Sequence, residues 1–191
     1  MKILFISLGC DKNLADSEEM LGLLTGNGHE IVDSEEEADA IVINTCCFIH
    51  DAKEESVNTI LEMAEYKKTG TCKILIVTGC MAQRYKEEIT KEIPEVDAVL
   101  GTTSYGDIVK ALNEAEAGHV FQEFKDINAL PEDSGRRVIT TGGHFGYLKI
   151  AEGCDKHCTY CIIPSLRGKF RSVPEERLLK QAEYMASQGV R

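Results

Sequence analysis

Apolar runs and amphipathic segments alternate along the first 117 residues. Five of the runs are short and rich in β-branched residues, which is typical of buried strands. They are Lys2–Leu8, His29–Val32, Ala40–Thr45, Lys73–Thr78 and Ala98–Leu100. The intervening segments carry apolar residues at helical spacing, and they span residues 13–25, 52–66, 82–93 and 105–116.

This alternation predicts βαβ units, and therefore a parallel sheet with helices on both faces. The expected fold class is α/β. A five-stranded, flavodoxin-like sheet fits the pattern better than a closed barrel.

Residues 118–144 interrupt the alternation with Gly, Pro and Ser, so we expect a linker there that holds one or two edge strands. A new unit follows, with a strand at Tyr147–Ala151, a loop that contains cysteines, and a helix at Pro174–Gln188. One strand and one helix cannot bury their own apolar faces. We therefore expect residues 145–191 to be the first βα unit of an incomplete, TIM-like partial barrel, and the chain to be a fragment.

Composition and charge narrow the class of protein. Hydrophobic residues make up 43% of the 191 residues, which predicts a packed core. The formal net charge is −11, divided as −14 over residues 1–140 and +3 over residues 141–191. An acidic first part disfavours nucleic acid as its partner and would attract a basic protein. An acidic surface with no partner is the simpler interpretation.

The cysteine content points to metal binding. No apolar run approaches the roughly 18 residues that span a membrane, and the apolar start is too short for a signal peptide, so a cytoplasmic location is expected. Eight cysteines in such a chain indicate metal binding or catalysis before disulfides.

The clearest motif is the Cys-x₃-Cys-x₂-Cys run of Cys154, Cys158 and Cys161. Three thiolates can hold a [4Fe–4S] cluster and leave one iron free to chelate S-adenosylmethionine, whose reductive cleavage gives a 5′-deoxyadenosyl radical. The aromatic Tyr160 before the last cysteine fits this pattern. The alternative is a structural zinc site with His157 as fourth ligand. It fits less well, because adjacent residues rarely reach one metal together.

A second set of cysteines follows the predicted strands. Cys10, Cys46 and Cys80 come after the first, third and fourth strands. In the order 2-1-3-4-5 these strands are neighbours about 4.8 Å apart, and their carboxyl ends share the edge where such folds bind ligands. The three thiols are candidate ligands of a second cluster. A role as small buried apolar side chains is equally compatible, and it is the expectation for Cys47 and Cys72.

Single residues near the cysteines allow simpler roles. Asn13, Asp16 and Ser17 follow Cys10, and helix capping accounts for at least one of them. Arg167 follows the Cys-x₃-Cys-x₂-Cys run, where contact with a cofactor and a place in a surface loop are equally compatible.

The motifs together resemble the radical S-adenosylmethionine methylthiotransferases, in their RimO-like branch. The resemblance covers the whole chain and rests on Ser7–Glu18 (SLGCDKNLADSE), Ile43–Ile49 (INTCCFI), Ala52–Ser56 (AKEES), Val77–Tyr85 (VTGCMAQRY), Tyr147–Cys154 (YLKIAEGC) and Ile162–Gly168 (IIPSLRG). The MiaB-like branch, which modifies transfer RNA, usually has Gln-Met-Asn where Asp11-Lys12-Asn13 stands here. Two residues depart from the RimO-like pattern: Asp11 replaces the usual Pro, and Cys47 replaces the usual Gly.

The resemblance implies a specific activity. It implies methylthiolation of the β-carbon of an aspartate in ribosomal protein S-twelve, with two [4Fe–4S] clusters and S-adenosylmethionine as cofactors. It also implies an electron donor such as flavodoxin or ferredoxin. Transfer RNA would be the substrate only under the MiaB-like alternative, and a non-catalytic iron–sulfur or zinc module is the alternative of another class.

The resemblance also assigns residues and domains. The implied ligand sets are Cys10, Cys46 and Cys80 for the auxiliary cluster, and Cys154, Cys158 and Cys161, beside Tyr160, for the radical cluster. The implied domains are a methylthiotransferase N-terminal (UPF-type) domain at residues 1–117, a linker at 118–144, and the start of a radical domain at 145–191. The chain by itself is expected to be inactive.

Overall fold

The structure is a computed structural model that describes residues 1–132 and 135–191. Its main feature is a parallel sheet of six strands in the order β2-β1-β3-β4-β5-β6. The strands are β1 (Lys2–Ser7), β2 (Glu30–Val32), β3 (Ala40–Thr45), β4 (Ile74–Gly79), β5 (Ala98–Leu100) and β6 (Phe121–Glu123). The predicted α/β class and the order of the first five strands are confirmed. The sixth strand, β6, is an edge strand within the segment that was predicted to be a linker.

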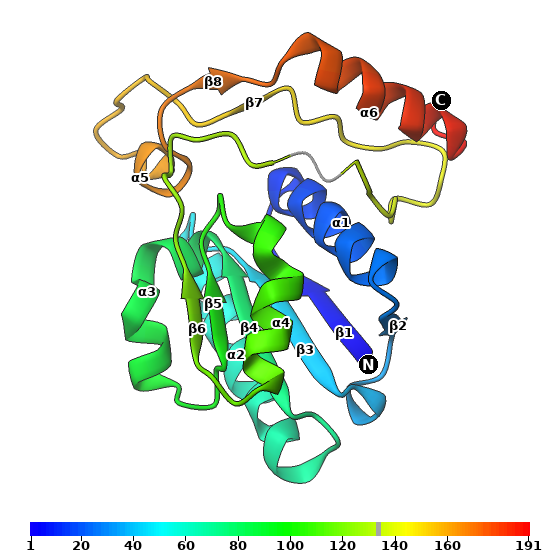
Figure 1. Cartoon of the computed structure of the whole chain (residues 1–191). Helices are drawn as coiled ribbons and strands as arrows, with labels where there is room; N and C mark the ends of the chain where they lie inside the picture. The colour runs from blue at the N-terminus through cyan, green and yellow to red at the C-terminus, as the bar shows by residue number, and fades with distance from the viewer. Residues whose placement is uncertain (133–134) are drawn as a thin grey trace.

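Two helices cover each face of this sheet (Figure 1). On one face lie α1 (Asp11–Gly26) and α4 (Ile108–Glu116), and on the other lie α2 (His50–Thr69) and α3 (Cys80–Glu92). Two short 3₁₀ turns, η1 (Glu35–Glu37) and η2 (Tyr105–Asp107), complete the connections. In the part of the chain that the structure describes, none of the helices combines the length and apolar character needed to cross a membrane.

The central strands form the core because both of their faces are covered. All six residues of β3 are buried, and their side chains alternate between the two helical layers. Ala40 and Val42 pack with α1 and α4, whereas Ile41 and Ile43 pack with α2 and α3. Continuous apolar runs in the sequence are the expected result of this double burial.

The last third of the chain crosses above the carboxyl ends of the strands (Figure 1). It contains β7 (Ala151–Glu152), α5 (Ile163–Arg167), β8 (Arg171–Ser172) and α6 (Glu175–Ser187). The predicted C-terminal helix is confirmed as α6. The strand predicted at 147–151 is largely wrong, because only Ala151 and Glu152 pair, and they pair antiparallel with β8.

The predicted linker packs against the first domain. Arg137 donates hydrogen bonds from its guanidinium to Glu18 of α1, and the Thr140 backbone N–H and hydroxyl also donate to Glu18. Both charged side chains are buried. Residues 133–134 of the predicted linker lie outside the described residues. The contacts of Glu18 thus hold the end of this segment on α1.

Candidate functional site: a cavity lined by three cysteines

The carboxyl ends of three neighbouring strands each deliver one cysteine. Cys10 precedes α1 after β1, Cys46 follows β3, and Cys80 begins α3 after β4. The parallel register aligns Ser7 with Asn44 and Thr45 with Gly79, so the three strands end at one level. The structure therefore brings together the three cysteines that the sequence proposed as a set. Their role as iron ligands stays a prediction.

All three cysteines line one cavity of about 390 Å³. Its lining is mostly apolar, and it is completed by the helix that follows the Cys-x₃-Cys-x₂-Cys run. The lining residues are Gly9, Cys10, Lys12, Cys46, Phe48, Ile49, Ala52, Cys80, Ile163, Leu166 and Arg167. Soft thiolates in a largely apolar enclosure are a donor set that suits iron–sulfur clusters. These residues therefore fit a cluster held by the three thiols.

Cys46 and Cys47 occupy different environments although they are adjacent. Cys46 lines the cavity, and its backbone is held by Ser56, whose hydroxyl accepts from the Cys46 N–H and donates to the Cys46 carbonyl. Cys47 lies in the core beneath α2 and α3. Burial raises the pKa of the Cys47 thiol, although Arg84 partly offsets this. Burial also raises the pKa of the Cys80 thiol, so the pKa does not separate members of the set from other cysteines. Cys46 and Cys80 line the cavity and Cys47 does not, and this placement favours Cys46.

Cys72 belongs to the same core and should be chemically inert. It is 3% exposed, and burial raises the pKa of its thiol. Since the thiolate is the nucleophile, we expect iodoacetamide to alkylate Cys72 far more slowly than the exposed Cys10 in cluster-free protein. Peptide mass spectrometry over a time course measures both rates. Equal rates at the two cysteines would contradict the described burial.

Two glycines allow the turns after β1 and β4 to pack closely against the end of β3. Gly9 and Gly79 precede Cys10 and Cys80, and each has a φ of 92°, in the region that favours glycine. A Cβ on Gly9 would lie 2.6 Å from the Cβ of Cys46, and a Cβ on Gly79 would lie 2.5 Å from the carbonyl oxygen of Thr45. The turn at each strand end therefore depends on the absent side chain.

Replacing Gly79 tests this dependence. Gly79→Ala should lower the free energy of unfolding by roughly 1–3 kcal/mol or more, because both the backbone conformation and the contact with Thr45 become strained. Gly106→Ala is the matched control, because a Cβ there meets nothing within 4 Å. Urea unfolding measures both variants. Equal midpoints would show that the turn tolerates a side chain.

The Cys-x₃-Cys-x₂-Cys run forms an open loop between β7 and α5. The Cys154 N–H donates to the carbonyl of Gly168 at 3.1 Å, and the Cys161 N–H donates to the carbonyl of Cys158 at 3.0 Å. Cys158 is exposed, and Cys154 and Cys161 are half-buried. Tyr160 is 90% exposed. The hydrogen bonds define the ends of the loop and leave its thiols accessible.

Neither cysteine set forms a single-ion site. Across residues 1–132 and 135–191, no group of three or more His, Cys, Asp or Glu side chains lies close enough to hold one metal ion.

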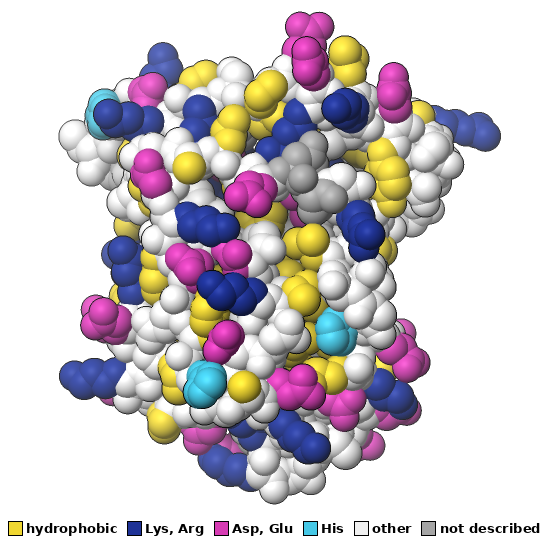
Figure 2. Space-filling view, viewed as in Figure 1, with side chains coloured by type: hydrophobic (Ala, Val, Ile, Leu, Met, Phe, Trp, Pro, Cys, Tyr) yellow, Lys and Arg dark blue, Asp and Glu magenta, His cyan; other side chains and the backbone are white. Residues whose placement is uncertain are grey.

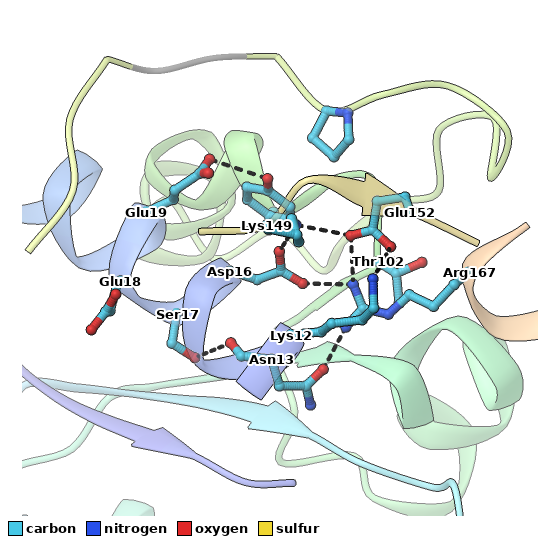
Figure 3. A network of polar contacts seen from close by, with 12 residues as sticks. Lys12, Asn13, Asp16, Ser17, Glu18, Glu19, Thr102, Lys149, Glu152 and Arg167 are labelled. Atoms are coloured by element: carbon cyan, nitrogen blue, oxygen red, sulfur yellow. Dashed lines mark hydrogen bonds and ion pairs between the residues drawn. The ribbon is translucent and has the colours of Figure 1, made fainter. Parts of the chain in front are cut away.

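A buried network of charges joins the two cysteine regions (Figure 3). Arg167 of α5 donates to Asp16 of α1 at 2.7 Å, to Asn13 at 2.5 Å and to Glu152 of β7 at 3.3 Å. Lys149 pairs with Asp16 and, at 2.8 Å, with Glu152. The four charged side chains are each 10% exposed or less. The α1 helix and the cysteine loop are thereby fixed relative to each other.

The network controls the protonation of its own members. Burial raises the pKa of Glu152, but Lys149 and Arg167 outweigh this effect and lower that pKa to about 2. Burial lowers the pKa of Lys149, and Asp16, Tyr105 and Glu152 together raise it above its usual value. Both groups therefore stay charged near neutral pH.

The sequence alone did not identify this network. The capping interpretation of Asn13, Asp16 and Ser17 is wrong: the position before α1 is Cys10, and no side chain there caps the helix. Asn13 instead donates to the carbonyls of Leu8 and Thr45. For Arg167 the surface-loop alternative is also wrong, since the side chain is 3% exposed. The signal in the sequence that could have indicated the network was the group of polar residues Asn13, Asp16 and Ser17 on one helix.

Comparison with known proteins agrees with the resemblance inferred from the motifs. The chain is 64% identical over 191 residues to a protein of Lachnoclostridium phytofermentans named "Ribosomal protein uS12 methylthiotransferase RimO". Proteins of the same name from Clostridioides difficile and Acetivibrio thermocellus are 50% and 49% identical. Each alignment covers 100% of this chain but 43% of the relative. The chain thus spans less than half the length of these relatives.

A family match covers the domain that carries the cavity. Residues 2–101 match the family described as "Uncharacterized protein family UPF0004". This range contains Cys10, Cys46 and Cys80, and it includes β1 to β5. Because the match extends over more than half of the 191 residues, the chain belongs to the UPF0004 family.

Proposed function

We propose that this chain is part of a radical S-adenosylmethionine methylthiotransferase that adds a methylthio group to the β-carbon of an aspartate in ribosomal protein uS12. The observation that carries the proposal is the convergence of Cys10, Cys46 and Cys80 on one cavity. The names of the relatives support the choice of substrate. We also propose the domain limits 1–117, 118–144 and 145–191 inferred from the sequence.

The two cysteine sets would hold different groups. Cys154, Cys158 and Cys161, with Tyr160 beside them, would hold a [4Fe–4S] cluster and S-adenosylmethionine. Cys10, Cys46 and Cys80 would hold the second [4Fe–4S] cluster. When bound, these groups supply the electron transfer, the radical and the sulfur chemistry.

The apolar residues of this chain would enclose the cluster and keep water away from it. Phe48 and Ile49 bring apolar side chains to the cavity from the loop after β3, and Ile163 and Leu166 bring them from α5. An apolar wall keeps water from a reactive centre and strengthens the electrostatic interactions inside it. Phe48 and Ile49 are 55% and 57% exposed, so they also form the rim by which a substrate would enter.

Charge supports a basic protein partner only in a general way. Residues 1–140 carry a net charge of −14, which favours association with a basic ribosomal protein. Figure 2 shows acidic and basic side chains interspersed over one face, without a single acidic patch there. A cytoplasmic location and an electron donor such as flavodoxin or ferredoxin complete the proposal.

Mass spectrometry of a deletion strain tests the substrate. Digested ribosomes should lose the methylthio mark on uS12, and bulk transfer RNA should keep its own marks. Loss of a methylthio group from transfer RNA with uS12 unchanged would overturn the proposal in favour of a MiaB-like activity.

Metal analysis tests the class of protein. After anaerobic reconstitution the chain should contain about eight irons and eight sulfides, as two [4Fe–4S] clusters require. One zinc per chain and no sulfide would instead indicate a non-catalytic zinc module.

A further inference from the structure

Two basic residues, Lys12 and Arg167, line the largely apolar three-cysteine cavity, and only Arg167 is buried. Arg167 lines the cavity beside Ile163 and Leu166, and its side chain is 3% exposed. Lys12 is the other basic residue of the lining, but its side chain is 44% exposed. Arg167 therefore provides the fixed, water-excluded positive charge of this site.

We propose that Arg167 is a positioning residue of the three-cysteine site, which orients Cys80 and places a permanent positive charge against the iron–sulfur cluster that the thiols bind. This inference rests on the proposed function. It assigns a role to a residue outside both cysteine sets.

The contacts of Arg167 fix its orientation. One guanidinium nitrogen bonds both Asp16 and Glu152, and the other bonds the side-chain oxygen of Asn13. The two carboxylates come from α1 and β7, on separate parts of the chain. A planar guanidinium held on several sides cannot turn away from the cavity without leaving a buried carboxylate unpaired.

The same contacts extend to Cys80. The Cys80 thiol donates to the side-chain oxygen of Asn13 at 3.7 Å, the oxygen that also accepts from Arg167. This bond belongs to the cluster-free protein, because a thiolate that ligates iron has no proton to donate. Arg167 and Cys80 line the same cavity, so Arg167 acts on this sulfur by its positive charge, and it also holds the Asn13 side chain beside it.

The charges around Arg167 predict in which direction it shifts the reduction potential of the cluster. Asp16 and Glu152 carry two negative charges, and Arg167 and Lys149 carry two positive charges, so the charges of these four enclosed side chains balance. Lys12, which is 44% exposed, lies 3.8 Å from Glu152 as a further, water-screened cation. Removing Arg167 would leave negative charge beside a cluster that gains another electron on reduction. The potential of such clusters depends on nearby charge and on hydrogen bonds to sulfur. Arg167 should therefore raise the reduction potential of this cluster.

Arg167 also lies at the end of the helix that closes the cavity. Arg167 ends α5, which begins two residues after Cys161. The helix that closes the auxiliary cavity thus emerges directly from the other cysteine loop. Loss of Arg167 should loosen this closure and expose the cluster to solvent and chelators.

The test isolates the three-cysteine site. In this chain, Cys154, Cys158 and Cys161 are all changed to Ala, so that only the auxiliary set can bind a cluster after anaerobic reconstitution. Into this background we introduce two variants. Arg167→Lys keeps the positive charge. The double variant Arg167→Gln with Asp16→Asn removes one charge of each sign, so that Asp16 is not left as a buried, unpaired carboxylate that could unfold the protein. Lys169→Gln is the matched control, since Lys169 is an exposed cation of the same segment that does not line the cavity.

Three readouts do not depend on activity: iron and sulfide content, the midpoint potential in a dithionite titration followed by electron paramagnetic resonance, and the rate at which a chelator removes iron. Arg167 lines the cavity and Asp16 does not, so the double variant loses the positive charge nearest the cluster although its network stays balanced. It should show a more negative potential and roughly tenfold faster iron loss, the lower end of the affinity cost of outer-shell changes. Arg167→Lys should restore most of the potential. Lys169→Gln should match the parent.

The outcomes separate the two proposals. A double variant that binds a full cluster with the parent's potential and rate of iron loss would overturn the role of Arg167 and leave the proposed function standing. A parent that binds no cluster at Cys10, Cys46 and Cys80 would overturn the proposed function, and with it this inference.

Discussion

Cys46→Ala is expected to remove one of the two iron–sulfur clusters completely, whereas Cys47→Ala keeps both. Cys46 lines the cavity with Cys10 and Cys80, and Cys47 packs in the core instead. Loss of one thiolate from a set of three leaves a second iron of the cube without a protein ligand. Iron and sulfide should therefore fall from about eight to about four per chain in Cys46→Ala.

Cys158→Ala provides the reciprocal variant. It should also retain about four irons and four sulfides, but from the auxiliary site rather than from the Cys-x₃-Cys-x₂-Cys loop. Added S-adenosylmethionine should therefore change the electron paramagnetic resonance spectrum of reduced Cys46→Ala and leave that of Cys158→Ala unchanged. A Cys47→Ala protein that loses four irons, beside a Cys46→Ala protein that loses none, would reverse the assignment of the ligand.

Lys149→Met should cause a large loss of stability, about 3–5 kcal/mol in the free energy of unfolding of cluster-free protein. Lys149 is 10% exposed and pairs with both Asp16 and Glu152. Without Lys149, the buried carboxylates of Asp16 and Glu152 would share Arg167 as their one remaining buried cation, and this charge imbalance destabilises the fold. Methionine keeps most of the side-chain volume, so the loss would come from charge rather than from a cavity.

Lys68→Met is the control for this variant. Lys68 pairs with Glu65 and Glu95, but its side chain is 55% exposed. Water screens an exposed pair, which therefore contributes little to stability, so the midpoint of urea unfolding should scarcely change. Similar losses in the two variants would show that the network of Asp16 and Glu152 is no more important than a surface ion pair.

The pattern of apolar positions determined the α/β layering of the first domain. Ala40–Thr45 and Ala98–Leu100 have the predicted limits, because strands buried on both faces need continuous apolar residues. The predicted strand at Tyr147–Ala151 was less reliable. Of its residues only Ala151 pairs with another strand, and the charged side chain of Lys149 is enclosed by its ion pairs rather than by an apolar face.

The sequence by itself determined the family resemblance and the spacing of the Cys-x₃-Cys-x₂-Cys run, since motifs are read along the chain. It also predicted the order of the first five strands and the grouping of Cys10, Cys46 and Cys80, since βαβ units place the carboxyl ends of parallel strands at one edge of a sheet. Only the tertiary structure decided which of Cys46 and Cys47 faces the cavity, and that Arg167 closes it. Arg167 meets Asn13 and Asp16 across more than 150 positions of sequence. A buried charge is stable only beside such partners, and no local pattern reveals partners that folding brings together from opposite ends of the chain.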